Sequence, residues 1–207
     1  MINSKVSFKT LSIAVVTFSS FAFVACGNNE TNTTTGGDTA TTSTTNESAN
    51  EGTAGSTSAV ADLTGTQPDT TVTGNARFSE ENGKVKMTLE ITVPKKANQS
   101  VAVHLHEHGS CGDMGKEAHG HWNPTKVNHG KWGGDNFHRG DIGNVKLDKE
   151  GKGKIEIETE LWTLTGTDST KNILSKAVIV HGGVDDYKTQ PTGNAGSRIG
   201  CGVIRKG

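Results

Sequence analysis

The chain has 207 residues, which is enough for one full domain with appendages. Lysine and arginine number 21 against 22 aspartates and glutamates, and this near-neutral balance argues against a nucleic-acid-binding surface. Glycine is abundant at 27 residues, aromatic residues make up only 5%, and no long helical periodicity is present. Such a composition favours a turn-rich β protein over a helical one.

Residues 1–26 have the pattern of a targeting segment. Two lysines precede an apolar run over residues 11–25, which is about the length of a signal-peptide core and short for a membrane-spanning helix. The run ends in Phe23-Val-Ala-Cys26-Gly, which resembles a bacterial lipobox, although Phe23 stands where leucine is usual. We therefore predict export and a lipid on Cys26 that anchors the chain to a membrane. An ordinary signal peptide with an incidental cysteine is the alternative, and both permit disulfides.

Residues 27–57 are mostly threonine, serine, asparagine and glycine, with almost nothing apolar. Such a segment buries too little apolar surface to offset its ordering entropy, so we predict a disordered tether. The folded domain is then expected over residues 58–207. It would stand off the membrane on the periplasmic or cell-surface side of the cell envelope.

Alternation of polar and apolar residues predicts about eight short antiparallel strands in this domain. They are expected over residues 59–63, 71–79, 84–93, 101–106, 142–147, 154–161, 177–180 and 201–204. Asn82-Gly83 marks a tight hairpin turn, and residues 148–151 form a second turn. The strand count predicts an all-β fold, either a Greek-key β-barrel or a sandwich. Two long glycine-rich loops, residues 109–141 and 182–200, interrupt the pattern, and loops of such length are usually functional.

Histidines are confined to one part of the chain, since all eight lie between residues 104 and 181. His104 and His106 are alternate residues of a predicted strand, so both imidazoles should lie on one face as a pair of metal ligands. His181 follows a fully apolar strand and adds a third nitrogen donor of the kind that suits copper. The long loop adds three imidazoles and one carboxylate, which match the needs of a tetrahedral zinc site. These are His121, His129, His138 and Asp141.

Six motifs together resemble those of the copper/zinc superoxide dismutase family, in that family's order. They are His104-Leu-His106-Glu, Gly120-His121-Trp-Asn-Pro, His129-Gly, His138-Arg-Gly-Asp141-Ile-Gly-Asn, Val180-His181-x3-Asp185-Asp and Gly193-Asn-Ala-Gly-Ser-Arg198-Ile-Gly-Cys201-Gly-Val-Ile. The resemblance covers roughly residues 59–207. No single motif is convincing, but the combination is highly specific.

The resemblance implies a role for each matched residue. It gives copper the ligands His104, His106, His121 and His181, and zinc the ligands His121, His129, His138 and Asp141. His121 is then the bridge between the two metals. Asp185 matches an aspartate that hydrogen-bonds one copper and one zinc histidine, and Arg198 matches the arginine that guides the anion beside the copper. Cys111 and Cys201 match an intrasubunit disulfide.

The activity that the resemblance implies is dismutation of superoxide to dioxygen and hydrogen peroxide, with one copper and one zinc ion per domain. The enzyme would protect the cell envelope, with Arg198 and His121 as its catalytic residues. It is expected to be a monomer or a homodimer and to bind no nucleic acid. A non-catalytic envelope protein that binds copper or zinc is the alternative. Loss of a copper ligand or of the arginine would indicate it, and neither is lost.

Some residues depart from the family's pattern. Ala102-Val103 stands where Gly-Phe is usual, which should alter packing and not ligation. The loop at residues 187–192 is short, which leaves the steering lysine open, with Lys188 as a candidate. His108 and His119 match no ligand position and are expected at the rim of the site, with weak surface metal binding as their alternative role.

A competing motif is present in the same stretch. The segment from His104 to His108 superficially resembles the metal motif of metallo-β-lactamase-like hydrolases. Those enzymes are α/β proteins with helices between their strands, and this chain has no such pattern, so we disfavour that interpretation.

Overall fold

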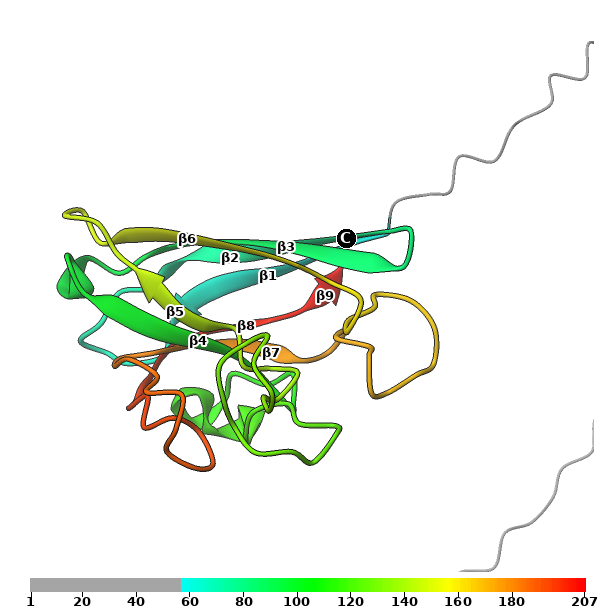
Figure 1. The fold of residues 1–207 in the computed structure, drawn as a ribbon. Helices are drawn as coiled ribbons and strands as arrows, with labels where there is room; N and C mark the ends of the chain where they lie inside the picture. Colours follow the sequence, from blue (N-terminus) through cyan, green and yellow to red (C-terminus); the bar gives the residue numbers. More distant parts are fainter. Residues whose placement is uncertain (1–56) are drawn as a thin grey trace, which may run out of the picture. The chain divides into compact units, whose positions relative to one another are not determined.

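The structure is a computed structural model that describes residues 57–207 (Figure 1). The predicted signal peptide, Cys26 and the predicted tether up to residue 56 lie outside the described residues. Nine strands and two short 3-10 helices are present among the described residues. The strands are β1 (Thr57–Gly65), β2 (Thr73–Glu81), β3 (Lys84–Thr92), β4 (Ser100–His106), β5 (Gly143–Lys146), β6 (Lys152–Thr159), β7 (Ala177–His181), β8 (Arg198–Val203) and β9 (Arg205–Lys206). The helices are η1 (Pro94–Lys96) and η2 (Asp113–Ala118).

The strands form one antiparallel sheet that curves into a nearly closed barrel (Figure 1). Their hydrogen-bonded order is β5-β4-β7-β8-β1-β2-β3-β6, and β9 pairs with β1. Neighbours such as β4 and β7, or β1 and β8, are far apart in sequence, as a Greek-key connection requires. The predicted all-β Greek-key fold is confirmed. Within residues 57–207 the structure has no helix of the length and apolarity needed to cross a membrane.

The β2–β3 hairpin shows how the sequence determines this fold locally. Glu81 pairs with Lys84, so Asn82 and Gly83 alone form the turn, and their φ angles of 51° and 75° suit a two-residue hairpin loop. Along β3, buried and more exposed side chains alternate, and the buried ones enter the barrel core. The predicted turn at residues 148–151 is also present, because Gly151 N–H donates to the Asp148 carbonyl at 3.0 Å.

Three elements were not predicted from the sequence, namely β9 and the two short helices η1 and η2. β9 pairs Arg205 with Val60 of β1, although both residues of β9 are exposed and charged and so carry no apolar pattern. The helix η2 lies within the long loop after β4 and is interrupted at Met114 and Gly115, whose φ values are 54° and 81°. A loop element of this kind has no periodicity that a sequence pattern can reveal.

β4, like its neighbour β7, is buried on both of its faces. Val101, Val103 and Leu105 belong to the barrel core. His104 and His106 point to the other face and have only 0% and 1% of their surface exposed. The loops that follow β4 and β7 lie together on that side in Figure 1. The face of β4 that carries polar side chains is therefore covered by loops and not by solvent.

Candidate metal centre

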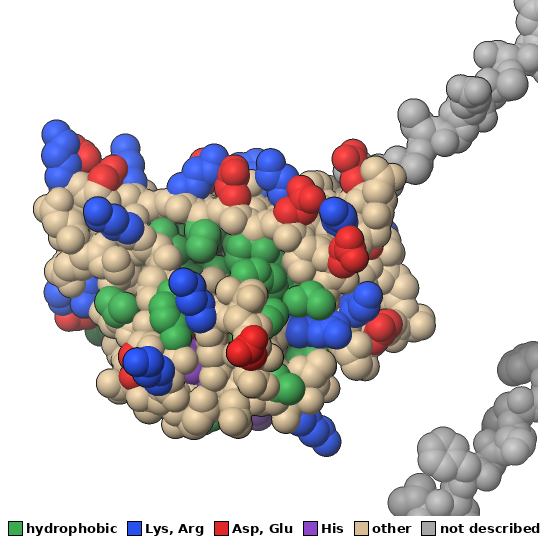
Figure 2. All heavy atoms as spheres, in the orientation of Figure 1, with side chains coloured by type: hydrophobic (Ala, Val, Ile, Leu, Met, Phe, Trp, Pro, Cys, Tyr) green, Lys and Arg blue, Asp and Glu red, His purple; other side chains and the backbone are tan. Residues whose placement is uncertain are grey.

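Four imidazoles converge beneath the loops that cover β4. His104 and His106 belong to β4, His181 ends the neighbouring strand β7, and His121 forms an isolated β-bridge with His106. Each residue offers one donor atom, and these atoms lie within 4.8 Å of one another. The Nε2 atoms of His106 and His181 are 3.3 Å apart, and the ring centroids of His104 and His121 are 3.9 Å apart. All four side chains are buried. On the face of the molecule drawn in Figure 2, histidine is visible only as small patches.

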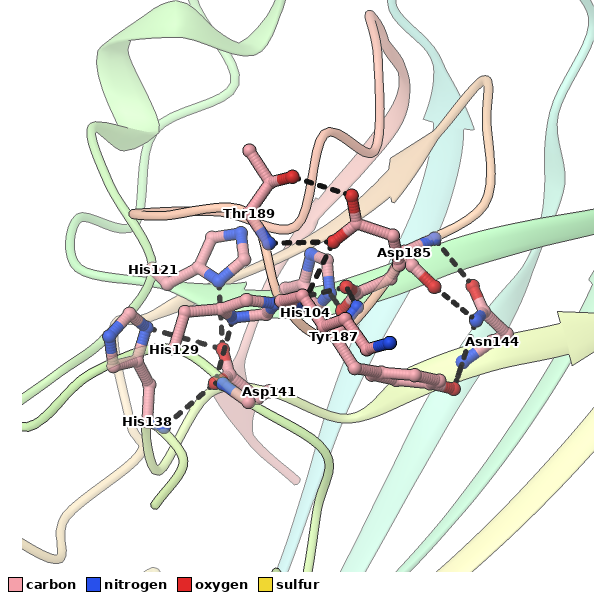
Figure 3. A network of polar contacts seen from close by, with 12 residues as sticks. His104, His121, His129, His138, Asp141, Asn144, Asp185, Tyr187 and Thr189 are labelled. Carbon is pink, nitrogen blue, oxygen red and sulfur yellow. Dashed lines mark hydrogen bonds and ion pairs between the residues drawn. The ribbon is translucent and has the colours of Figure 1, made fainter.

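A second buried group shares His121 with the first. The Asp141 carboxylate lies 2.8 Å from His121 Nδ1 and 2.9 Å from His129 Nδ1. His138 Nδ1 is 3.3 Å from the same carboxylate, and Figure 3 shows the three rings around it. The backbone N–H groups of Gly130 and His138 donate to Asp141 Oδ2 at 3.1 and 2.7 Å. The loop backbone thus fixes the carboxylate that faces the three rings.

Four buried ring nitrogens in these two groups have no hydrogen-bond partner among the described residues. They are His104 Nδ1, His121 Nε2, His129 Nδ1 and His138 Nδ1. His129 Nδ1 lies close to the Asp141 carboxylate, but the two groups are not oriented for a hydrogen bond. Their interaction is therefore one of charge alone. A buried polar atom left without a partner costs about 1–3 kcal/mol, so four in one place indicate ligand atoms. The donor sets fit copper in the four-imidazole group and zinc around Asp141.

Three imidazoles of the four-imidazole group, those of His106, His121 and His181, are held in the neutral form. Burial lowers the pKa of His106 well below its usual value, and the neighbouring imidazoles of His121 and His181 add to the effect. Burial likewise lowers the pKa of His121 to about 4 and that of His181 to about 3. Neutral imidazoles keep a ring lone pair free for a metal ion.

The electrostatic balance is reversed around Asp141. Burial opposes the charged form of His129, but contacts with Asp141 and Asp185 outweigh burial and raise the pKa of His129 to about 9. Burial also opposes ionisation of Asp141, yet its histidine contacts hold the Asp141 pKa well below the usual range. The buried carboxylates therefore favour positive charge at this end of the site, which is the charge that a metal cation supplies.

Asp185 contacts one histidine of each group through its carboxylate. Its Oδ2 is 2.9 Å from His104 Nε2, and its Oδ1 is 2.9 Å from His129 Nε2. Asn144 holds the Asp185 backbone through two hydrogen bonds of 2.9 Å, and Asn144 Nδ2 also donates to the Tyr187 hydroxyl at 2.9 Å (Figure 3). Sequence reasoning found Asp185 but missed Asn144 and Tyr187. Asn144 ends one of the recognised motifs, and that position was the only signal available for it.

Arg198 begins β8 and is paired in register with His181. Its guanidinium is half-buried and donates to the carbonyl oxygens of Gly115 and His119. It lines a pocket of about 240 Å³. The other lining residues are Gln67, Met114, Lys116, Gly196 and Ser197. Lys116, and not the candidate Lys188, is therefore the lysine that shares this pocket with Arg198.

A disulfide joins Cys111 to Cys201 with a Cα–Cα distance of 5.7 Å, as the family resemblance implied. It links the long loop to β8 across a sequence separation of 90 residues. In the chain-entropy model, closing a loop of that length contributes roughly 4–5 kcal/mol to stability. The bond also holds the loop segment whose Gly115 carbonyl accepts from Arg198. The disulfide therefore helps to keep the guanidinium in place.

Comparison with known proteins places this site in a family. The family model described as copper/zinc superoxide dismutase (SODC) matches residues 72–204. The chain belongs to the copper/zinc superoxide dismutase family. A curated relative, superoxide dismutase (Cu-Zn) 1 from Aquifex aeolicus, is 38% identical over 138 residues, which are 64% of this chain and 79% of that protein.

A second relative carries the same family name, and a solved structure shares the fold. An extracellular superoxide dismutase (Cu-Zn) from Haemonchus contortus is 37% identical over 107 residues, which are 49% of this chain and 57% of that protein. A solved structure described as the clock protein EA4 is similar with a TM-score of 0.62 and 32% identity, and covers 71% of this chain and 92% of that chain. The family's one copper and one zinc ion fit the two groups of donors found here.

Proposed function

We propose that this chain is an exported superoxide dismutase of the cell envelope whose two buried groups hold the family's two metals. Copper binds His104, His106, His121 and His181, and zinc binds His121, His129, His138 and Asp141. The observation that carries the assignment is the position of His121. Its Nδ1 lies 2.8 Å from Asp141, while its Nε2 is buried without a hydrogen-bond partner in the part of the chain that the structure describes. One imidazole thus offers a nitrogen to each group.

The reaction consumes two superoxide anions and two protons and yields one dioxygen and one hydrogen peroxide. When bound, copper supplies the one-electron redox couple and zinc a fixed positive charge beside His121. Arg198 attracts the anion, because this cationic residue lines a pocket and its backbone is paired in register with that of His181. His121 Nε2 carries the proton, since its other nitrogen is held toward Asp141. Asp185 orients His104 and His129 through their Nε2 atoms.

Protein loaded with copper and zinc is expected to suppress the reduction of cytochrome c by superoxide generated with xanthine oxidase. The metal-free protein is the control and should not suppress it. A protein that binds two metals per chain and leaves cytochrome c reduction unchanged would contradict the enzymatic assignment. It would favour a non-catalytic copper- and zinc-binding protein.

Replacing Arg198 with alanine is expected to lower the rate of superoxide removal by about tenfold or more, because electrostatic steering raises association rates by about 10–10³. Both metals should remain, since Arg198 is not a ligand. Stopped-flow measurement of superoxide decay, with metal analysis of the same sample, tests both statements. Arg77→Ala removes an exposed arginine from β2 and is the matched control. Equal rates for Arg198→Ala and Arg77→Ala would rule out the guiding role.

We infer that residues 1–26 direct export, that a lipid on Cys26 anchors the chain, and that residues 27–57 tether a domain at 58–207. The apolar run and the lipobox-like sequence support this proposal, and so does the relative named as extracellular. Cys26→Ser is expected to move the protein from the membrane fraction to the soluble fraction. Asn29→Ser in the same segment is the control and should stay with the membrane. A mature wild-type chain whose intact mass lacks lipid would disprove the anchor.

A further inference from the structure

A third group of metal-binding side chains lies at the surface, close to the four-imidazole group. It consists of Glu107, His108 and His119, which are all exposed and whose donor atoms lie within 4.8 Å of one another. None of these side chains belongs to either buried group. We propose that this trio, the outer histidine site, binds a third divalent transition-metal ion.

The backbone brings the three side chains together. Glu107 N–H donates to the Gly120 carbonyl and His108 N–H to the Ala118 carbonyl, each at 3.1 Å, so residues 107–108 run alongside 118–120. The rings of His108 and His119 are close neighbours, with centroids 4.1 Å apart. Binding an ion here has to order little more than the side chains, because the two backbone segments are already paired.

The backbone of His119 is in a conformation that glycine favours. Its φ is 63° and its ψ is −144°, a region that residues with side chains rarely adopt. A glycine here would relieve this strain, so the imidazole is retained at a cost in stability. Such a cost is expected where a side chain has a function.

Two imidazoles and one carboxylate define the class of ion. This donor set suits zinc(II) and copper(II), with copper(II) the tighter of the two in the Irving–Williams order. Water completes the coordination, since all three side chains are exposed. Lys176 opposes binding, because its Nζ donates to the Glu107 carbonyl at 3.0 Å and places a positive charge beside the site. The outer histidine site should therefore fill after the two buried sites.

Titration calorimetry of zinc(II) into protein that already holds one copper and one zinc is expected to detect a third equivalent. His119→Gly should weaken this third binding event by at least about tenfold, because losing even a hydrogen-bond partner of a ligand costs about 10–100-fold in metal affinity. Glycine adopts the backbone conformation of His119 without strain, so the carbonyl that accepts from His106 Nδ1 at 2.8 Å is preserved. A melting temperature at or above that of the wild type will show that this variant is folded.

Three further variants separate the outer histidine site from binding elsewhere on the surface. His108→Gln should weaken the third equivalent as His119→Gly does, whereas Lys176→Met should strengthen it. Glu158→Gln removes an exposed carboxylate from β6 and should change nothing. A loaded protein that takes no third equivalent, or a His119→Gly variant with full affinity, would overturn the proposal. The titration does not measure dismutation, so its failure leaves the proposed function untouched.

Discussion

Replacing His181 with alanine is expected to abolish superoxide dismutation while zinc stays bound. His181 belongs to the four-imidazole group and not to the group around Asp141, so under the proposed assignment its loss removes one copper donor and no zinc donor. Loss of a residue that only hydrogen-bonds a metal ligand lowers metal affinity by up to about 10²-fold. Loss of a ligand itself should therefore weaken copper binding by at least about 10²-fold. Dismutation assays and metal analysis of the purified variant measure the two effects separately.

The reciprocal variant is the matched control for His181→Ala. His138 belongs only to the group around Asp141, so His138→Ala should lose zinc and leave all four copper donors in place. His121 belongs to both groups, and His121→Ala should weaken both metals. If His181→Ala lost zinc as readily as copper, the two groups would not be separate sites that share one residue.

The proposed ligand residues were accessible to sequence reasoning because their chemistry is local and their spacing is regular. His104 and His106 lie on one face of a strand because alternate side chains of any strand do. The loop ligands were found as a set of residue types within one glycine-rich segment, and the structure brings that set around Asp141. The structure also pairs Cys111 with Cys201, as the family motifs implied.

The supporting contacts were not accessible in the same way, because they depend on tertiary geometry. The carbonyl of His119 accepts from His106 Nδ1 and from Arg198, and a backbone carbonyl leaves no trace in a residue pattern. The pairing of Asn144 with Asp185 joins residues 41 positions apart. Lys116 reaches the pocket of Arg198 because η2 folds back onto β8, which no local propensity predicts.

The barrel strands and the long loop each contribute part of the site. β4 and β7 deliver His104, His106 and His181 on a rigid frame, because their backbones are paired along the strands. The remaining donors come from a loop with little apolar content of its own. That loop is held by the disulfide, by the bridge between His106 and His121, and by Asp185. Contacts that fix the loop should therefore matter for metal binding almost as much as the ligands do.

Asp185 offers the sharpest test of this conclusion, since it contacts a histidine of each group and is itself no ligand. Asp185→Ala is expected to lower the affinity for both metals by about 10–100-fold each, because it frees the rings of His104 and His129 at once. It also leaves two buried imidazole Nε2 atoms without a partner, which costs about 1–3 kcal/mol each in stability. Competition with chelators measures each affinity, and thermal melting of the metal-free protein measures the stability.

The neighbouring aspartate is the matched control. Asp186 is exposed and, within residues 57–207, its carboxylate accepts hydrogen bonds only from Lys188 and Thr189 of its own turn. Asp186→Ala removes the same charge one residue away and should leave both metal affinities unchanged. If the two variants behaved alike, the effect would come from the negative charge of the loop and not from the orientation of the rings.

Asp185→Asn refines the test, because it keeps the size of the side chain while leaving one oxygen in place of two. The single remaining oxygen can accept a hydrogen bond from only one of the two rings. The affinity for one metal should therefore fall more than the affinity for the other.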